Sequence, residues 1–212
     1  MGFYLNMCSY IIDAMARTAG SHSQTTGPRV RAQAEALFAK HGYAAVSMRQ
    51  IAAAVGVQAG ALYNYFPDKQ SLLFSLLHDH MTELLAAWDG QGLSNDPLTA
   101  LDQFTQFHLE YHLNRKDAVF IAYMELRNLN ADNFDTIETL RRRYEDQLER
   151  LIIAAQQAGQ ITVADTRIVT LAVIGMLTEV TTWYRQGGRL DVAQLCDMYK
   201  TLVRRTLGAT QI

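Results

Sequence analysis

Residues 47–73 read SMRQIAAAVGVQAGALYNYFPDKQSLL, and this stretch decides the fold of the N-terminal part of the chain. Ser47 is a favourable N-cap for a short helix, because its side-chain oxygen can accept a hydrogen bond from a free amide of the first turn. Gly56 can adopt the positive φ of a tight turn, and a further helix is expected over about residues 58–65. Two short helices joined by such a turn are typical of a helix-turn-helix. The recognition unit is therefore predicted within residues 47–66.

The outward face of the expected helix 58–65 is suited to DNA. Leu62 and Phe66 are expected to pack inward, which leaves small and polar residues outside. Gln58 and Asn64 can hydrogen-bond base edges, and hydroxyl or cationic side chains can bind phosphates. The predicted DNA-binding residues are Ser47, Arg49, Gln58, Ala59, Gly60, Tyr63, Asn64, Tyr65 and Lys69.

The charge distribution agrees with a DNA-binding N-terminal part. Residues 1–69 hold six Lys or Arg and three Asp or Glu, whereas residues 70–212 hold thirteen and eighteen. This suggests that only the N-terminal part meets a polyanion. An imbalance of this size also arises by chance, and the alternative is a plain three-helix packing unit with a solvated polar face.

The remaining chain shows helical periodicity, capping residues and short connections, without a convincing strand pattern or internal repeat. Asp68, Asp117, Asp165 and Asp191 are expected to cap helices. These features predict an all-α protein with nine helices. The first helix is expected to begin at Pro28 and end at Gly42, the second to run from Ser47 through Ala54, and the seventh to start at Asp132 or Asn133 and end at Gly159. The other expected helices cover about 58–65, 69–88, 97–113, 118–129, 165–186 and 191–207.

The quoted stretch resembles the N-terminal signature of the TetR family of transcriptional repressors, and the preceding RAQAEALFAKHGYAAVS (residues 31–47) fits as well. The resemblance implies an operator-binding homodimer with a nine-helix, Ω-shaped fold. It places phosphate contacts on Ser47, Tyr63, Tyr65 and Lys69, and base contacts on Gln58, Ala59, Gly60 and Asn64. The chain departs from the family at Gln58, where Ser or Thr is frequent, and at Ala59, where Lys or Arg is common. We therefore expect few base contacts and an affinity that depends on phosphates.

Residues 89–160 carry many aromatic side chains at helical spacing, which fits either a hydrophobic core or the wall of a small-molecule pocket. Residues 175–208, GMLTEVTTWYRQGGRLDVAQLCDMYKTLVRRTLG, resemble the C-terminal domain of TetR regulators of fatty-acid and steroid catabolism. This resemblance implies a small hydrophobic effector, with an acyl-CoA or related lipid favoured. The expected ligand-binding residues are Phe104, Phe107, His108, Tyr111, Phe120, Tyr123, Met124, Tyr144, Met176 and Trp183.

The run Arg141–Arg143 lies beside Tyr144 and could neutralise the phosphates of a CoA thioester, with Arg127 and Arg185 as other candidates. The alternative is a solvated helix face. Acidic residues three or four positions further on would pair with the run, and we favour this alternative. The acidic residues in question are Glu145, Asp146 and Glu149.

The last two expected helices carry apolar residues that could form a four-helix bundle with a second copy of the chain. Two-fold symmetry would place two recognition helices about one DNA turn, roughly 34–36 Å, apart. The predicted dimer-interface residues are Ile168, Leu171, Ala172, Gly175, Leu195, Met198, Tyr199 and Leu202.

Several other classes of site are disfavoured by the sequence. His108 and His112 have i,i+4 spacing but no HExxH context, and we expect no metal site and no cofactor. Neither a nucleotide-binding glycine loop nor a nucleophile motif occurs, so an enzyme is not expected. Cys8 and Cys196 do not form a disulfide framework, and no apolar run reaches the length of a membrane span. We therefore expect a cytoplasmic protein.

The sequence predicts three regions: an N-terminal extension over residues 1–27, a helix-turn-helix domain over 28–72, and a ligand-binding and dimerisation domain over 73–212. Residues 1–14 are expected either to be non-native, with the protein starting at Met15, or to form a short amphipathic arm. The leading functional hypothesis is a repressor that a ligand releases from a palindromic operator. The alternatives are a TetR-like DNA binder without a small-molecule effector, and a ligand-binding protein or enzyme without DNA function.

Overall fold

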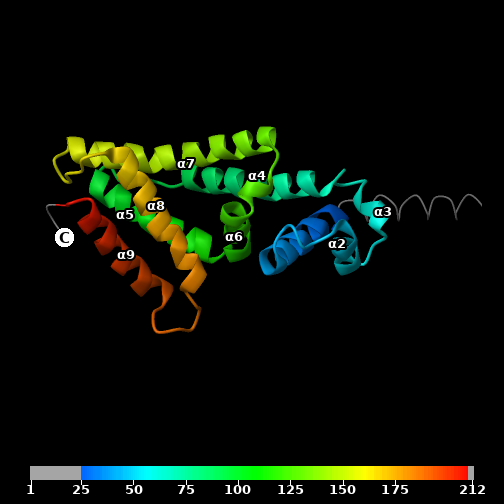
Figure 1. Cartoon of the computed structure of the whole chain (residues 1–212). Helices are drawn as coiled ribbons and strands as arrows, with labels where there is room; N and C mark the ends of the chain where they lie inside the picture. Colours follow the sequence, from blue (N-terminus) through cyan, green and yellow to red (C-terminus); the bar gives the residue numbers. More distant parts are fainter. Residues whose placement is uncertain (1–24, 210–212) are drawn as a thin grey trace, which may run out of the picture. The chain divides into compact units, whose positions relative to one another are not determined.

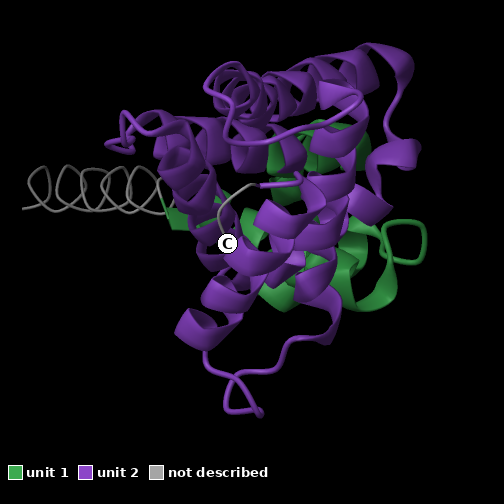
Figure 2. Cartoon of the chain, turned by 90° about the vertical axis from the view of Figure 1, so that its left-hand side faces the viewer, with its two compact units in different colours: residues 1–76 green, residues 77–212 purple. Residues whose placement is uncertain are grey.

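The computed structural model describes residues 25–209, which divide into two compact units at residues 76 and 77 (Figure 2). The expectations for residues 1–24 lie outside this range. All regular elements of the described chain are helical, so the prediction of an all-α fold with nine helices is confirmed (Figure 1). The helices are residues 25–41, α2 (Met48–Val55), α3 (Ala59–Leu62), α4 (Lys69–Asp89), α5 (Pro97–Leu113), α6 (Lys116–Met124), α7 (Ala131–Gln157), α8 (Thr166–Trp183) and α9 (Val192–Thr206), with a 3-10 turn, η1 (Leu126–Asn128), after α6.

Most predicted helix starts are confirmed by hydrogen bonds at the caps. The side chains of Asp165 and Asp191 accept from the amides of Ile168 and Gln194. The prediction for Asp117 is wrong: α6 begins at Lys116, and Asp117 lies in its first turn. The predicted start of the first helix at Pro28 is also wrong, because residues 25–27 are already helical and the fixed φ of proline is compatible with a helix.

Several other predicted helix ends differ from the observed ones: α6 ends at Met124 and α8 at Trp183, before the predicted 129 and 186. α3 is a single turn over Ala59–Leu62, shorter than the expected 58–65, because the chain continues over residues 63–65 as turns rather than as α-helix. α7 starts one or two residues earlier than predicted, because Asn130 rather than a later residue accepts the amide hydrogen bond of Asn133. Sequence patterns therefore located every helix, but the choice between neighbouring polar caps required the structure.

Unit 1 is built around the buried side chains of Phe38, Ile51 and Leu62, which come from the helix over residues 25–41, from α2 and from α3. α2 begins with a capping box: the Ser47 amide donates to Gln50 Oε1 at 2.7 Å, and the Gln50 amide donates to Ser47 Oγ at 3.3 Å. Gly56 follows its last residue, Val55, as the C-cap, and its φ of +79° confirms the predicted left-handed turn. The cap and the glycine thus fix both ends of α2 locally.

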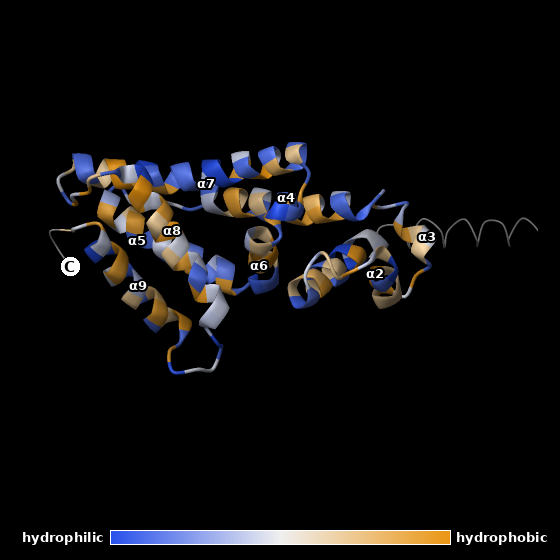
Figure 3. Cartoon of the chain, viewed as in Figure 1, coloured by the Kyte–Doolittle hydropathy of each residue, from blue (hydrophilic) through white to orange (hydrophobic). Residues whose placement is uncertain are grey.

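In unit 2, α5 packs against α7, α8 and α9. Polar residues cover most of α7 in Figure 3, and its buried positions form one stripe that includes Ile137, Tyr144, Leu148 and Ile152. Spacings of seven, four and four place these side chains on one face of a helix. α7 therefore covers the core with one side and meets solvent with the other.

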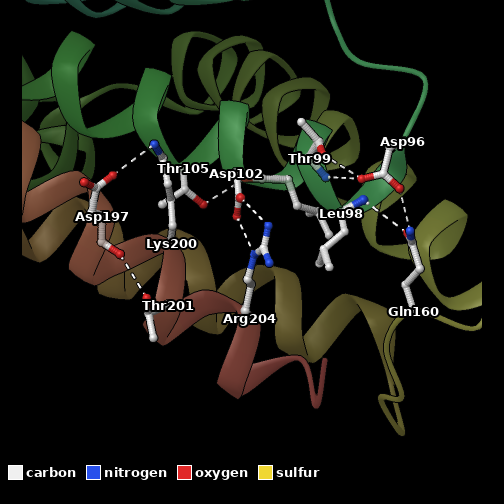
Figure 4. Close-up of polar contacts among 11 residues, drawn as sticks. Asp96, Leu98, Thr99, Asp102, Thr105, Gln160, Asp197, Lys200, Thr201 and Arg204 are labelled. Atoms are coloured by element: carbon white, nitrogen blue, oxygen red, sulfur yellow. Dashed lines mark hydrogen bonds and ion pairs between the residues drawn. The ribbon is translucent and has the colours of Figure 1, made fainter. Parts of the chain in front are cut away.

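Polar contacts also join α5 to α9 and to the turn after α7 (Figure 4). The Arg204 guanidinium of α9 donates to both carboxylate oxygens of Asp102 on α5, from Nε at 3.0 Å and from Nη2 at 2.6 Å. The Gln160 side chain donates to Asp96 and accepts from the Leu98 amide at 3.2 Å. A bidentate arginine–carboxylate pair fixes geometry as well as distance. It therefore holds α9 in register on α5.

Arg204→Met is expected to lower the free energy of unfolding of unit 2 by about 1–3 kcal/mol, because it leaves the half-buried Asp102 carboxylate without its bidentate donor. Arg205→Met on the same helix replaces an exposed side chain and is the control. Urea unfolding followed by circular dichroism measures the difference. Equal midpoints for the two variants would contradict a structural role for the Arg204–Asp102 pair.

Candidate functional site

The residues predicted to meet DNA lie on the outer side of α3 and its flanks. Tyr63 is 53% exposed, and Gln58, Gly60 and Asn64 are exposed, whereas Leu62 is fully buried. Ala59 and Tyr65 are half-buried. The inward and outward sides of this helix therefore match the expected pattern, and contact with DNA stays a prediction.

Ser47 and Arg49, at the start of α2, are also exposed. The Ser47 hydroxyl is engaged in the capping box, where it donates to Gln50 Oε1 at 2.8 Å. It keeps a further acceptor lone pair, but its donor is used. Arg49 extends from the first turn of the same helix, so it is the better placed of the two as a donor to a phosphate.

Lys69 is bound inside unit 1. Its ammonium donates to the carbonyl oxygens of Tyr43 at 2.9 Å and Val46 at 2.8 Å, and lies 4.1 Å from the centroid of the Tyr43 ring. Val46 directly precedes the N-cap Ser47. Lys69 therefore holds the turn that leads into α2, a function that the sequence did not indicate.

Arg29 has a comparable position at the other end of α2. Its guanidinium donates to the carbonyl oxygen of Val55 at 2.7 Å. This is the last residue of α2, and Gly56 follows it. The sequence does not indicate this role of Arg29, because the contact joins residues 26 positions apart.

In unit 2, a chain of polar side chains crosses the core. His108, fully buried, lies with Nδ1 3.2 Å from Tyr144 Oη and with Nε2 3.1 Å from Thr178 Oγ1. Tyr123 Oη is also 3.1 Å from Thr178 Oγ1. The structure thus brings together three predicted ligand-binding residues, His108, Tyr123 and Tyr144, around a threonine of α8.

Two further histidines adjoin this chain. His112 stacks on His108 with ring centroids 3.9 Å apart, and His80 of α4 lies edge-on to His112 at 6.0 Å. Burial lowers the pKa of His80 to about 4 and that of His112 to about 3, and it also lowers the pKa of His108. All three imidazoles are therefore neutral near pH 7. Among buried side-chain atoms of the described residues, His80 Nδ1 and Tyr111 Oη have no hydrogen-bond partner.

His80 was not predicted as a site residue. The sequence does not indicate a site at His80, because His78 and His80 are two positions apart and lie on different faces of one helix. A cavity of about 20 Å³ lies beside it, with His80, His112, Tyr123, Arg141, Tyr144 and Glu145 as its polar lining. Met81, Leu84, Ala122 and Ile174 complete the wall.

Other predicted ligand-binding residues lie elsewhere. Phe104 and Phe107 pack on Trp88 with ring centroids 4.9 and 5.2 Å away, and Phe107 and Tyr111 also line an open groove of about 480 Å³ with several polar residues. Met176 is half-buried on α8. The side chains of Phe120, Met124 and Trp183 are 40%, 49% and 48% exposed. The aromatic residues therefore do not all surround one cavity.

The favoured interpretation of the run Arg141–Arg143 as a solvated helix face fits the exposed Arg142 and Arg143, but the expected pairing with acidic residues is wrong. Glu145, Asp146 and Glu149 instead bind Arg167 of α8. Arg141 pairs with Glu138 at 3.4 Å and covers the Tyr123 ring at 4.7 Å. Within residues 25–209, Arg142 and Arg143 are exposed and pair with no carboxylate. Arg167 takes these acids because α7 and α8 pack together, which helical spacing alone does not show.

The predicted dimer residues form an exposed apolar face on α8 and α9, with one exception. Ile168 is 66% exposed, and Leu171, Met198 and Leu202 are also exposed. Ala172 and Gly175 are exposed, and Tyr199 is half-buried. Leu195 is only 1% exposed, so it belongs to the core of its own chain rather than to this face.

Residues 25–209 contain neither a cluster of metal-ligating side chains nor a helix suited to span a membrane. No group of three or more His, Cys, Asp or Glu side chains has an arrangement that could hold a metal ion. None of the helices over residues 25–209 combines the length and apolar character needed to cross a membrane.

Comparison with known proteins gives matches over both units. Residues 30–76 match the family model of bacterial regulatory proteins of the tetR family, and residues 94–207 match that of the tetracyclin repressor-like C-terminal domain. The KstR2 transcriptional repressor of Mycobacterium tuberculosis is 25% identical over 192 residues, which are 89% of this chain and 96% of that protein. The fatty acid metabolism regulator protein of Bacillus subtilis is 24% identical over 75% of this chain and 84% of its own length.

Solved structures agree with these matches. A tetR-family regulatory protein from Rhodococcus RHA1 superposes with a TM-score of 0.83 at 26% identity, covering 88% of this chain and 99% of that one. AibR, solved in complex with isovaleryl coenzyme A and operator DNA, has a TM-score of 0.73 at 24% identity, over 85% of this chain and 99% of its own. The chain therefore belongs to the TetR family of bacterial regulatory proteins and is a DNA-binding transcriptional regulator.

Proposed function

We propose that the protein is a homodimeric repressor that a small hydrophobic effector, an acyl-CoA or related lipid, releases from a palindromic operator. The observation that carries the DNA-binding half of this proposal is the exposed side of α3 over a fully buried Leu62. Gln58 and Asn64 are proposed to read bases, and Ser47, Arg49, Tyr63 and Tyr65 to bind phosphates, with Ala59 and Gly60 allowing close approach. Lys69 supports this surface by holding the turn before α2.

The effector half of the proposal is supported by the polar chain in the core of unit 2. Buried polar side chains among apolar and aromatic walls are typical of small-molecule sites. Among similar proteins, AibR was solved with isovaleryl coenzyme A and operator DNA, and the Bacillus subtilis relative is a fatty acid metabolism regulator. α4 contains both Lys69 of unit 1 and His80 of unit 2, so it is the proposed route by which an effector changes DNA binding.

The decisive experiment measures binding of the full chain to the DNA upstream of its own gene by fluorescence anisotropy. Acyl-CoAs of 4 to 16 carbons, the corresponding fatty acids and free CoA are then added. We expect a saturable complex at a palindromic site and its release by at least one acyl derivative, but not by free CoA. Specific DNA binding with no release by any of these compounds would favour the alternative, a regulator without a small-molecule effector.

Asn64→Ala provides a matched test of base reading. If Asn64 reads a base, the variant binds the operator about 10-fold to 100-fold more weakly, while its affinity for unrelated DNA stays unchanged. Gln91→Ala, in an exposed turn of unit 2, is the control. Equal losses on operator and unrelated DNA would assign Asn64 to the phosphates instead.

The proposed dimer face on α8 and α9 is tested by Leu171→Asp. A carboxylate at the centre of an apolar interface has no partner, and such a change costs about 3 kcal/mol or more, or a hundredfold or greater rise in the dimer dissociation constant. Ile153→Asp on α7 is the control, since Ile153 is 38% exposed and lies outside this face. Sedimentation equilibrium distinguishes the two, and a dimeric Leu171→Asp protein would contradict the proposed interface.

A further inference from the structure

Unit 2 contains buried polar atoms that have no hydrogen-bond partner among the described residues, and one of them belongs to His80. His80 is 5% exposed, and its Nδ1 has no hydrogen-bond partner within the described chain. The cost of leaving such an atom unpaired is about 1–3 kcal/mol. Because His80 lines the cavity of about 20 Å³, a group that enters this cavity can supply the missing partner.

The charges around the cavity favour one kind of group. Arg141 lines it, and Arg115 is close enough to add to the effect of burial in lowering the pKa of His80. The carboxylate in the lining, Glu145, is already bound to Arg167. Burial lowers the pKa of His112 and raises that of Tyr144, so both add neutral polar groups to the lining, and Tyr123 adds a hydroxyl. The surroundings therefore favour an anion over a neutral or cationic group.

We infer that the effector is an apolar molecule that carries a carboxylate, and that this carboxylate is received between His80 and Arg141. The inference rests on the proposed effector site and names the chemistry that the site selects. A carboxylate can share the Arg141 guanidinium with Glu138, which lies 3.4 Å from it, whereas a plain hydrocarbon end cannot. The carboxylate then accepts hydrogen bonds from Arg141 and from the His80 N–H.

Binding has to be accompanied by rearrangement of the wall. A volume of about 20 Å³ accommodates roughly one water molecule, whereas a carboxylate with its hydrocarbon tail is larger. Met81, Leu84 and Ile174 form the apolar part of the wall. Methionine adapts readily to new shapes, so the tail is expected to enter on the Met81 side.

The anion also changes the protonation of the site. Burial keeps the His80 imidazole neutral near pH 7, and a carboxylate beside it favours the imidazolium form. Binding is therefore expected to take up a proton, and affinity to rise as the pH falls from 8 to 6, by at most about tenfold per pH unit. The other charged or titratable groups around His80 are Arg115, Arg141, Glu145, Tyr111 and His112.

The test uses isothermal titration of the full chain with straight-chain carboxylates of 4 to 16 carbons, and with primary alcohols of the same lengths. For at least one length, the carboxylate is expected to bind about tenfold or more tightly than the alcohol, in keeping with a charged hydrogen bond. His80→Phe is expected to abolish most of this preference. His78→Phe, the same change on the same helix at a side chain that is 41% exposed, is expected to retain it.

Arg141→Met is a second variant that keeps the test valid if His80→Phe fails to fold. It is expected to weaken carboxylate binding and to leave alcohol binding unchanged. Equal affinities for carboxylates and alcohols, no binding of any carboxylate, or a preference that survives both substitutions would overturn the inference. Release from the operator by acyl-CoAs without any carboxylate preference would do so as well, but would leave the proposed function standing. Failure of every acyl derivative to release the operator would contradict the proposed function instead.

Discussion

Replacing Lys69 with methionine is expected to destabilise unit 1 and to weaken operator binding, without changing the salt dependence of that binding. The substitution removes the donor of two carbonyl oxygens, those of Tyr43 and Val46, and a cation over the Tyr43 ring. Unpaired carbonyls and a lost cation–π contact together cost about 2–4 kcal/mol. Because Val46 leads directly into the N-cap of α2, the first helix of the motif loses its anchor.

Salt dependence distinguishes this function from a phosphate contact. Each phosphate that a lysine neutralises adds about 0.9 to the slope of log affinity against log salt concentration. A lysine that binds carbonyl oxygens within the protein adds nothing to that slope. We therefore expect a lower unfolding midpoint and a weaker complex, but the same slope as for the unchanged protein.

Lys40→Met is the matched control, because Lys40 is an exposed lysine in the helix over residues 25–41. It is expected to leave the unfolding midpoint unchanged. Urea unfolding and anisotropy titrations from 50 to 300 mM salt provide both measurements. A slope reduced by about one for Lys69→Met, with an unchanged midpoint, would show that Lys69 binds a phosphate instead.

The comparison of Lys69 with Ser47 and Gly56 shows which features of the helix-turn-helix are visible in the sequence. The Ser47 cap and the left-handed Gly56 depend on residues within three or four positions, so residue type and spacing predict them. Lys69 reaches carbonyls 23 and 26 positions away, and its acceptors are backbone atoms that carry no residue signature. Its partners therefore could not be read from the sequence.

In the candidate effector site of unit 2, too, contacts between residues far apart in the sequence could not be predicted. Periodicity predicted that α5 would bury an aromatic face, and His108 and Tyr144 are buried as that pattern requires. It did not predict that His80 of α4 would join them, or that Arg167 would take the acidic residues of α7. Both depend on which faces of separate helices meet, which amphipathic spacing leaves open.

The histidines of this core make stability strongly dependent on pH. The pKa of His80 is lowered to about 4 and that of His112 to about 3, mainly by burial, and that of His108 is lowered too. In the unfolded chain a histidine has a pKa of about 6.5 and binds protons more tightly than in the folded chain. Stability is therefore complete above that pH and decreases as the pH falls below it. The decrease continues until the folded pKa values are reached.

The expected loss is large enough to unfold unit 2. Each pKa unit corresponds to about 1.4 kcal/mol, so His80 and His112 together remove roughly 5 kcal/mol by pH 4.5. This is comparable with the total stability of a typical domain, about 5–15 kcal/mol. Urea midpoints measured between pH 7.5 and 4.8 are expected to decrease steeply below pH 6.

His80→Phe isolates one histidine of the three. Phenylalanine keeps an aromatic ring beside His112 and Tyr111 but cannot be protonated, and the lost Nδ1 had no hydrogen-bond partner in the described chain. The variant is therefore expected to bind about one proton fewer on unfolding near pH 5, which gives a shallower decrease in stability. His78→Phe changes a half-exposed histidine of the same helix and is expected to keep the original slope. If both variants retain that slope, the acid sensitivity comes from groups other than His80, and the neutral imidazole beside the cavity is not the cause.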